Sequence, residues 1–253
     1  MPFKPSLRSV TDLRKEHDVN PLRAVGILGN LGCEGGFEVS GSCFLYKFGD
    51  IAITAAHCIP DTTTPMGLYF PLRRGEPARI TEQIILHPSA DVAIVKTSPV
   101  DPGEDGHELF RECALPVGLG HDFATYGFPT EGPIYAGDHK VTPRLFKGYL
   151  QHYMPYADPA GRQYEASEMS IPAPAGLSGS PVFFPDQPEM ITGVVTTNIE
   201  SYAVIDSVTE VDDDGRVYRE SSKRVVAYGV ALQLDPLKEW INDTSTSLSR
   251  ATD

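Results

Sequence analysis

The sequence predicts a mainly β protein, with two consecutive β domains and one helix near the carboxyl end. Short runs rich in β-branched residues recur roughly every 8–12 residues, a spacing typical of all-β proteins. A stretch rich in Pro, Gly and acids divides these runs into two series. The last apolar residues follow helical spacing instead of alternating, which indicates a helix.

The first series of predicted strands belongs to a domain that we place at residues 21–115. Its members are separated by Gly, Pro or Asp and comprise residues 24–28, 42–48, 51–56, 78–86 and 92–97. The polar segment before it, residues 1–20, predicts an arm or a short helix. The dividing stretch, SPVDPGEDGHELFRE at residues 98–112, predicts a surface connection.

The second series belongs to a domain that we place at residues 116–234. Its runs are residues 123–129, 141–153, 165–171, 180–185, 190–198, 201–211, 215–220 and 224–232. The sequence DDG at residues 213–215 predicts a hairpin turn. At residues 235–253 an Asp-Pro pair precedes Leu237, Trp240 and Ile241, which predicts a helix followed by a tail.

Composition narrows the class of protein. Of 253 residues, 41% are hydrophobic, which suffices for a sizeable core. The formal net charge of −13 disfavours a nucleic-acid partner. No apolar run is long enough to predict a membrane span, and residues 1–20 lack the apolar core of a secretory signal. We therefore expect a cytoplasmic protein, secreted only if a signal has been removed.

The segment Gly176-Leu177-Ser178-Gly179-Ser180-Pro181 is the sharpest chemical signal. A nucleophilic Ser needs exposure on a tight turn and backbone N–H groups directed at the developing oxyanion. The two glycines permit the unusual backbone of such a turn. Taken alone, a simple Gly/Ser-rich turn between strands is an equally good interpretation.

Two further segments carry a His and an Asp in settings that need a reason. His57 follows small residues in TAAHC, where a packed core histidine is the plainer interpretation. Asp91 opens the apolar run DVAIV, where a buried carboxylate requires hydrogen bonds, although capping a turn would also explain it. The other histidines show no ligand spacing, so we predict no metal site.

Together, TAAHC, DVAIV and GLSGSPV resemble the three catalytic segments of the trypsin/chymotrypsin superfamily, and GLSGSPVF is most similar to its bacterial glutamyl-endopeptidase and HtrA-like branches. Further matches place the resemblance at about residues 22–243; they are YGFP at 126–129, GVVT at 193–196 and YGV at 228–230. The resemblance implies two antiparallel six-stranded β-barrels of the chymotrypsin type with a C-terminal helix. It also places Cys43 and Cys58 where many members have a disulfide, although a reducing cytosol would keep them as thiols.

The family's roles imply a serine endopeptidase that needs no cofactor. Ser178 would attack the scissile carbonyl, His57 would transfer the proton, and Asp91 would orient His57. The N–H groups of Gly176 and Ser178 would form the oxyanion hole. We expect a protein or peptide substrate and limited cleavage in a regulated bacterial pathway, with a regulatory protein partner as a further hypothesis.

Leu177 stands where the secreted digestive members have an Asp that pairs with a freed N-terminus. A Leu cannot form that ion pair, so we predict no zymogen switch of this type.

The resemblance places the substrate pocket at Pro172, Ala173, Thr196, Thr197, Asn198 and Gly229. No charged residue stands at its expected base, so we predict a preference for a small or medium apolar P1 residue. The alternative is that an acid from residues 199–223 reaches the pocket and selects Arg or Lys; this segment is otherwise a solvated hairpin.

The sequence is compatible with two other functions. One is a protease-like binding module without turnover, which the complete triad argues against. The other is an esterase, although the usual α/β-hydrolase order with Ser before His is not seen.

Overall fold

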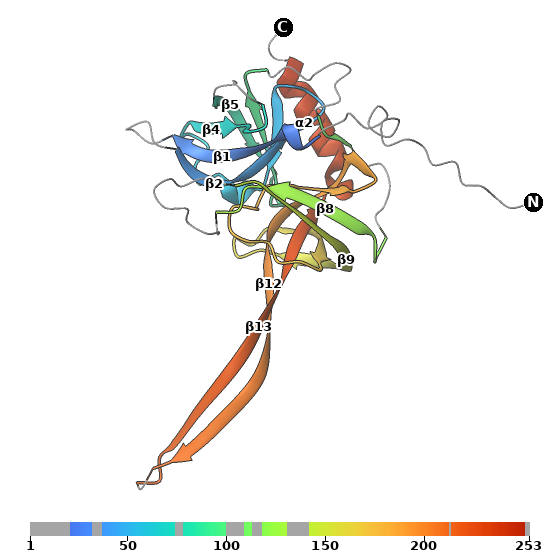
Figure 1. The fold of residues 1–253 in the computed structure, drawn as a ribbon. Helices are drawn as coiled ribbons and strands as arrows, with labels where there is room; N and C mark the ends of the chain where they lie inside the picture. Colours follow the sequence, from blue (N-terminus) through green and yellow to red (C-terminus); the bar gives the residue numbers. More distant parts are fainter. Residues whose placement is uncertain are drawn as a thin grey trace, which may run out of the picture.

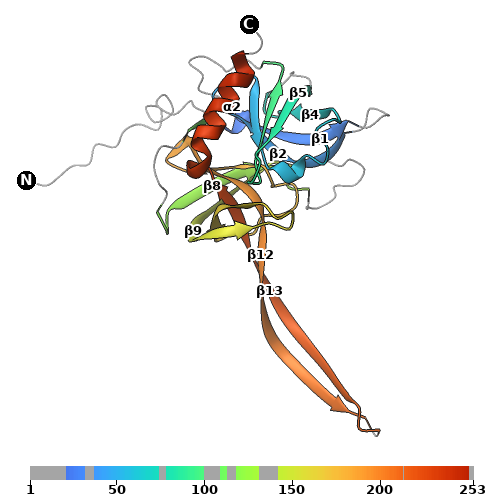
Figure 2. The ribbon, with the colours of Figure 1, turned by 180° about the vertical axis from the view of Figure 1, so that it is seen from behind.

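The computed structural model describes residues 21–31, 37–73, 78–99, 109–112, 118–130, 142–212 and 214–250. The predicted N-terminal arm at residues 1–20 lies outside the described residues. Figure 1 shows a body of two β halves, a helix packed on one half, and a long two-stranded ribbon leaving the other half. The reverse view in Figure 2 shows the same ribbon projecting away from the body.

The first half is a closed barrel of six strands. Its strands are β1 (Val25–Leu31), β2 (Phe37–Leu45), β3 (Ile51–Thr54), β4 (Met66–Tyr69), β5 (Arg79–Leu86) and β6 (Ala93–Thr97). They pair in the order β1-β2-β3-β6-β5-β4, which closes on itself. Phe44, Ile53 and Ile94 are fully buried in its core. The predicted six-stranded first barrel is confirmed, and β4 is a strand that the sequence did not indicate.

The second half is a seven-stranded sheet. Its strands are β7 (Arg111–Glu112), β8 (Asp122–Gly127), β9 (Arg144–Ala157), β10 (Gln163–Met169), β11 (Pro181–Phe184), β12 (Gln187–Val211) and β13 (Val217–Gln233). The order is β11-β8-β9-β10-β13-β12-β7, and β11 also pairs with β12. That pairing joins six strands into a ring, and β7 adds a seventh strand, parallel to β12. The prediction of a second six-stranded barrel is therefore only partly right.

Part of the predicted surface connection is buried. Phe110 is fully buried, and its ring packs edge-on against Phe44 at 5.4 Å between centroids. Leu109 is also buried, and β7 follows directly. The prediction was wrong for Leu109 and Phe110, because Phe110 packs between Phe44 of the first barrel and Phe183 of the second sheet, whereas Arg111 is exposed as predicted.

Strands β12 and β13 continue beyond the body as one antiparallel ribbon, which we call the ribbon arm (residues 199–227). The predicted turn closes its tip, where Asp212 Oδ1 accepts the N–H groups of Asp214 and Arg216 at 3.1 and 2.7 Å. Gly215 adopts φ = 77° there, a conformation that L side chains disfavour. The runs that the sequence presented separately are thus two continuous strands.

The helix α2 (Lys238–Arg250) follows a short 3-10 turn, η4 (Asp235–Leu237). It packs on the first barrel, against β3 and β6. Lys96 Nζ donates to the Leu248 carbonyl at 2.6 Å, and Ser249 Oγ donates to Asp50 Oδ1 at 3.1 Å. The predicted helix is confirmed for the described residues, none of whose helices has the length and apolarity to span a bilayer.

Candidate active site

His57 and Asp91 are brought together by two turns of the first barrel. His57 lies in the 3-10 turn η2 (Ala56–Cys58) that follows β3, and Asp91 lies between β5 and β6. The Asp91 carboxylate receives the His57 backbone N–H at 2.9 Å on Oδ1, and His57 Nδ1 lies 2.7 Å from Oδ2. The side chain of Asp91 is 3% exposed and that of His57 is 39% exposed. This geometry fixes one ring nitrogen on the carboxylate and leaves the imidazole accessible.

The alternative reading of Asp91 as a turn cap does not hold, because another side chain caps that turn. His87 Nδ1 accepts the N–H groups of Ser89 and Ala90 at 3.1 and 2.9 Å. Burial lowers the pKa of His87, which suits a neutral acceptor. The carboxylate of Asp91 is thereby left for His57.

A third partner of Asp91 comes from the second sheet. Arg162, in the turn between β9 and β10, places its guanidinium 2.9 Å from Asp91 Oδ1. Asp158 holds this Arg in place: Oδ2 lies 2.6 Å from Arg162 Nε, and Oδ1 accepts the Arg162 backbone N–H at 2.8 Å. Sequence analysis could not identify Arg162, because no local pattern links residue 162 to residue 91.

The turn that carries Ser178 is shaped by two glycines. Gly176 and Gly179 have φ values of +86° and +85°. A Cβ on Gly179 would collide with the Ser42 carbonyl and the Thr54 hydroxyl. Leu177, between them, is fully buried in an apolar cluster that includes Phe123. Where an Asp would need an ion pair, the Leu anchors the turn by packing.

The backbone N–H groups at this turn are arranged to receive an anion. The Ala175 carbonyl accepts the Thr130 N–H at 2.8 Å. Because C=O and N–H point in opposite directions across a trans peptide, the N–H of Gly176 points away from Thr130. Among the described residues, the N–H groups of Gly176 and Ser178 have no hydrogen-bond acceptor. Two free donors flanking a Ser hydroxyl can form an oxyanion hole.

Ser42 of the first barrel ties down the turn of the second sheet. Its N–H donates to the Ser178 carbonyl at 2.8 Å, and its hydroxyl donates to the Gly176 carbonyl at 2.8 Å. The same hydroxyl accepts the Phe128 N–H at 3.0 Å. Because Ser42 is fully buried, these bonds hold the nucleophile turn against the barrel that supplies His57.

The Ser178 hydroxyl is bonded to a backbone carbonyl, not to His57. Ser178 Oγ donates to the Thr196 carbonyl at 2.9 Å, and the described residues show no hydrogen bond between Ser178 and His57. Thr196 is an extra residue in β12: Val195 pairs with Ala231 and Thr197 with Val230, so Thr196 bulges out. Bulges re-aim backbone groups beside active sites. The three predicted residues are thus gathered, but the bond between Ser178 and His57 is not made.

The pKa of His57 is raised to about 10. Burial acts to lower it, but the hydrogen bond to the Asp91 carboxylate and contact with the Cys58 sulfur outweigh burial. A raised pKa keeps the imidazole protonated to higher pH, and a protonated imidazole cannot accept the Ser178 proton. A protonated His57 agrees with the Ser178 hydroxyl donating to the Thr196 carbonyl instead of to His57.

Three of the predicted pocket residues lie against one another. The Asn198 side-chain amide is hydrogen-bonded to the backbone of Ala173. Asn198 Oδ1 accepts the Ala173 N–H at 2.6 Å, and Asn198 Nδ2 donates to the Ala173 carbonyl at 2.7 Å. The Gly229 N–H donates to Ile171 at 2.7 Å, and a Cβ at residue 229 would strike Met169. Asn198 therefore bridges from β12 to Ala173, which was predicted to lie at the base of the pocket.

The remaining predicted pocket residues differ in exposure: Pro172 is exposed, Thr197 is half-buried and Thr196 is buried. The acids at Asp206, Glu210 and Asp212 lie on the ribbon arm, which carries them away from the body in Figures 1 and 2. The structure does not bring them to the pocket of their own chain.

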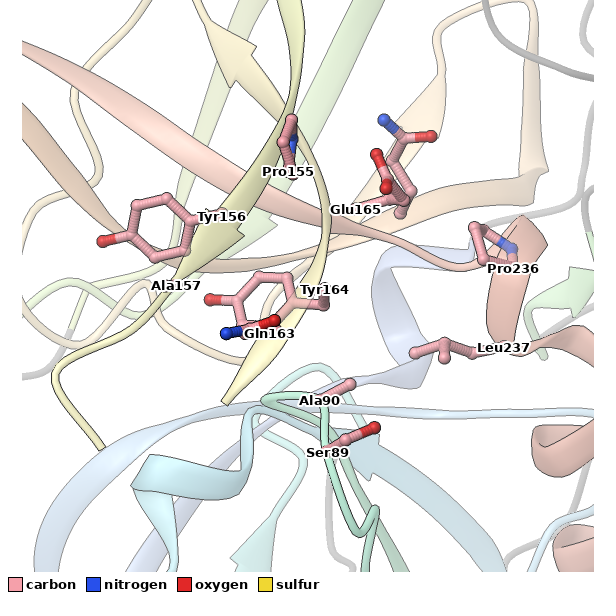
Figure 3. A pocket seen from close by; sticks show the side chains of 11 residues that line it. Ser89, Ala90, Pro155, Tyr156, Ala157, Gln163, Tyr164, Glu165, Pro236 and Leu237 are labelled. Atoms are coloured by element: carbon pink, nitrogen blue, oxygen red, sulfur yellow. The ribbon is translucent and has the colours of Figure 1, made fainter. Parts of the chain in front are cut away.

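A cavity of about 390 Å³ lies near Asp91 but apart from the reacting groups. Figure 3 shows Ser89 and Ala90 on one side and Tyr156 and Tyr164 on the other. The Tyr164 hydroxyl reaches Thr196 Oγ1 at 3.4 Å. Neither Ser178 nor His57 lines this cavity.

Cys43 and Cys58 are both buried and both free thiols. Burial raises the pKa of Cys43 well above its usual value, so it packs as a neutral side chain. The disulfide found at this place in many members is thus absent here. No group of three or more His, Cys, Asp or Glu able to hold a metal occurs among the described residues.

Comparison with solved structures identifies the class of fold. The Rv3671c protease from M. tuberculosis in its active form is 16% identical, with a TM-score of 0.55 over 92% of this chain and 89% of that one. The MamO protease domain from Magnetospirillum magneticum is 15% identical, with a TM-score of 0.57 over 88% and 97%. Kallikrein-related peptidase 10 is 16% identical, with a TM-score of 0.57 over 89% and 97%.

This chain therefore has the fold of the trypsin-like serine proteases, as its three motifs predicted. No protein-family model and no curated protein sequence matches it. The likeness thus lies in the fold.

Proposed function

We propose that this protein is a serine endopeptidase in which Ser178, His57 and Asp91 cleave a peptide bond through an acyl-enzyme. The observation that carries the proposal is the two-point contact of His57 with buried Asp91, beside a Ser whose turn offers two free N–H donors. Ser178 would attack, His57 would carry the proton to the leaving amine, and Gly176 and Ser178 N–H would hold the oxyanion.

The resting bond between Ser178 and Thr196 supports a site that substrate assembles. An extended peptide lying beside β12 offers N–H groups to its carbonyls, as strand addition does at other sheet edges. An N–H that takes the Thr196 carbonyl leaves the Ser178 hydroxyl without its acceptor, and rotation about one side-chain bond can then direct it to His57. Substrate binding thereby competes with the resting bond.

The absence of an Asp at residue 177 fits a turn that needs no freed N-terminus. Leu177 is fully buried without any ion pair, and Ser42 supplies the bonds that hold the turn. Cleavage of the chain near residue 22 should therefore leave peptidase activity within about twofold of the uncut chain. A large gain would show that an N-terminal switch exists.

A silent binding module is the second candidate, because Ser178 is bonded to Thr196 and Asn198 is bonded to Ala173 within the predicted pocket. A fluorophosphonate probe separates the two functions. A peptidase reacts at Ser178, and the Ser178→Ala variant does not react. Failure of the wild-type protein to react from pH 7 to pH 10 would support the binding module. Peptide cleavage should then be measured on the reactive protein, since ester cleavage alone would favour an esterase.

A further inference from the structure

The ribbon arm exposes apolar side chains over most of its length. Eight large ones are at least half exposed: Tyr202, Val204, Ile205, Val208, Val211, Val217, Tyr218 and Val225. A two-stranded ribbon is at best marginally stable in water by itself. Clustered exposed apolar surface marks an interaction site. This exposure directs attention to the arm as an interaction surface.

The two outer edges of the arm differ. Strand β12 contains a bulge at Ile205, because Val204 pairs with Lys223 while Asp206 pairs with Ser222. Bulges protect an edge against pairing with another strand. The facing strand, β13, runs through these positions without an extra residue. Its regular edge is the one suited to accept another strand.

The free part of the β13 edge has defined ends. Its outer side pairs with β10 only at residues 229–232, and the Gly229 N–H already donates to Ile171. At the tip, the Arg216 carbonyl points inward and accepts the Asp212 N–H. Since backbone groups alternate along a strand, the outward ones belong to residues 217, 219, 221, 223, 225 and 227. Within the described chain these positions have no outer strand partner.

This free edge is symmetric about Ser222. A second antiparallel copy with its Ser222 opposite this Ser222 engages every outward group, 217 with 227, 219 with 225 and 221 with 223. Pairs directly opposite one another then share a face, as an antiparallel sheet requires. Six residue pairs are hydrogen-bonded in this register, and each exchanges two bonds, so the edge makes about twelve hydrogen bonds, within the range of about 5–15 that protein interfaces carry.

The side chains complement one another in the same register. Glu220 of each copy faces Arg224 of the other, and neither has an ion-pair partner among the described residues of its own chain. Tyr218 faces Val226, and Arg219 faces Val225. No like charges are opposed. Cross-strand pairs of this kind stabilise antiparallel pairing.

We propose that two copies of this chain associate through the outer edges of β13, joining their arms into one four-stranded antiparallel sheet. The bodies then lie at opposite ends of the joined arms. This separation limits repulsion between two chains that each carry a formal charge of −13.

The proposal can be tested by exchanging the charges at Glu220 and Arg224 and measuring the oligomeric state of the full chain by sedimentation. The wild type should be a dimer at micromolar concentration, and Glu220→Arg or Arg224→Glu should each weaken it at least about tenfold. The double exchange should restore dimerisation, because each new Arg again faces a Glu. Glu210→Arg, on the other strand of the same face, should leave the dimer intact. A monomeric wild type, or singles that the double exchange does not rescue, would overturn the proposal.

A cysteine variant tests the register itself. Ser222→Cys places two thiols opposite one another across the dimer, so oxidation should give a cross-linked species of twice the chain's mass. Ser221→Cys, which faces Lys223, should cross-link far less. Equal cross-linking of the two variants, or none at residue 222, would refute the proposed pairing.

Discussion

The Arg162 guanidinium lies 2.9 Å from the same Asp91 carboxylate that holds His57 at 2.7 Å. Asp91 is thus shared between a base and a permanent cation. A positive charge beside Asp91 weakens the hold of the carboxylate on a proton at His57. Arg162 also reaches Asp91 from the second sheet, so it couples the two halves at the active site. It acts as a positioning residue through Asp91.

Replacing Arg162 by Met should move the proposed peptidase activity to higher pH. Without the cation, Asp91 favours the imidazolium more strongly, so the pKa of His57 rises and less neutral base is present at a given pH. The acid limb of the kcat/KM profile should shift upward by about one pH unit, and the rate at pH 8 should fall about tenfold.

Arg162→Lys should recover part of this loss, because it keeps the charge but not the fork geometry. Arg216→Met, at the exposed tip of the ribbon arm, is the matched control. An unchanged pH profile in a folded Arg162→Met protein would contradict the assigned role.

The raised pKa of His57 predicts alkaline activation. Only the neutral imidazole can take the Ser178 proton, so the rate of labelling by a fluorophosphonate should rise with pH toward a midpoint near 10. A rate already at its plateau by pH 7 would show that His57 is neutral there.

The same shift makes a prediction for stability. The folded-state pKa of His57, about 10, exceeds its ordinary value of about 6.5. The stabilisation is fully present below about pH 6.5 and is lost as the pH rises through 10. The difference in melting temperature between wild type and His57→Ala should therefore be larger at pH 6 than at pH 10, as thermal melts can measure.

Gly179→Ala should abolish the nucleophile turn, while Gly120→Ala should be tolerated. Both glycines have positive φ, +85° and +77°, so both variants lose about 1–2 kcal/mol. Only the Cβ at residue 179 meets neighbours, the Ser42 carbonyl and the Thr54 hydroxyl, whereas residue 120 faces open space. Urea unfolding should show a loss of about 3 kcal/mol or more for Gly179→Ala, together with loss of probe labelling. Equal losses of unfolding free energy in Gly179→Ala and Gly120→Ala would contradict a collision of the Cβ at residue 179 with its neighbours.

Asn198→Ala should widen the range of accepted P1 residues. The amide bridges from β12 to both backbone groups of Ala173, at the predicted base of the pocket, and its removal opens that space. In a library of peptides varied at P1, the wild type should favour small apolar residues and the variant should accept larger ones. Thr209→Ala, at an exposed position on the ribbon arm, is the control and should keep the wild-type profile. Strong wild-type cleavage after Arg would refute a neutral pocket.

The contact between His57 and Asp91 agrees with the sequence analysis, which singled out both residues, and Ser178, from short local patterns. Ser42 and Arg162 could not be predicted, since each acts through a partner far along the chain, at residues 178 and 91. The bulge at Thr196 also escaped prediction, because register depends on which strand pairs opposite it. Strand β4 is only four residues long and gave too little periodicity. Residues in local motifs could be identified from the sequence, whereas residues that act through distant partners could not.

Helix α2 follows both sheets in sequence yet packs on the first barrel, where Leu248 and Ser249 bind Lys96 and Asp50. During synthesis, α2 is translated only after the second sheet. The first barrel therefore lacks its packing partner α2 until the end of translation. The half that supplies His57 and Asp91 reaches its final packing after the half that supplies Ser178 has been translated. The order of translation thus delays the assembly of the proposed active site in a nascent chain.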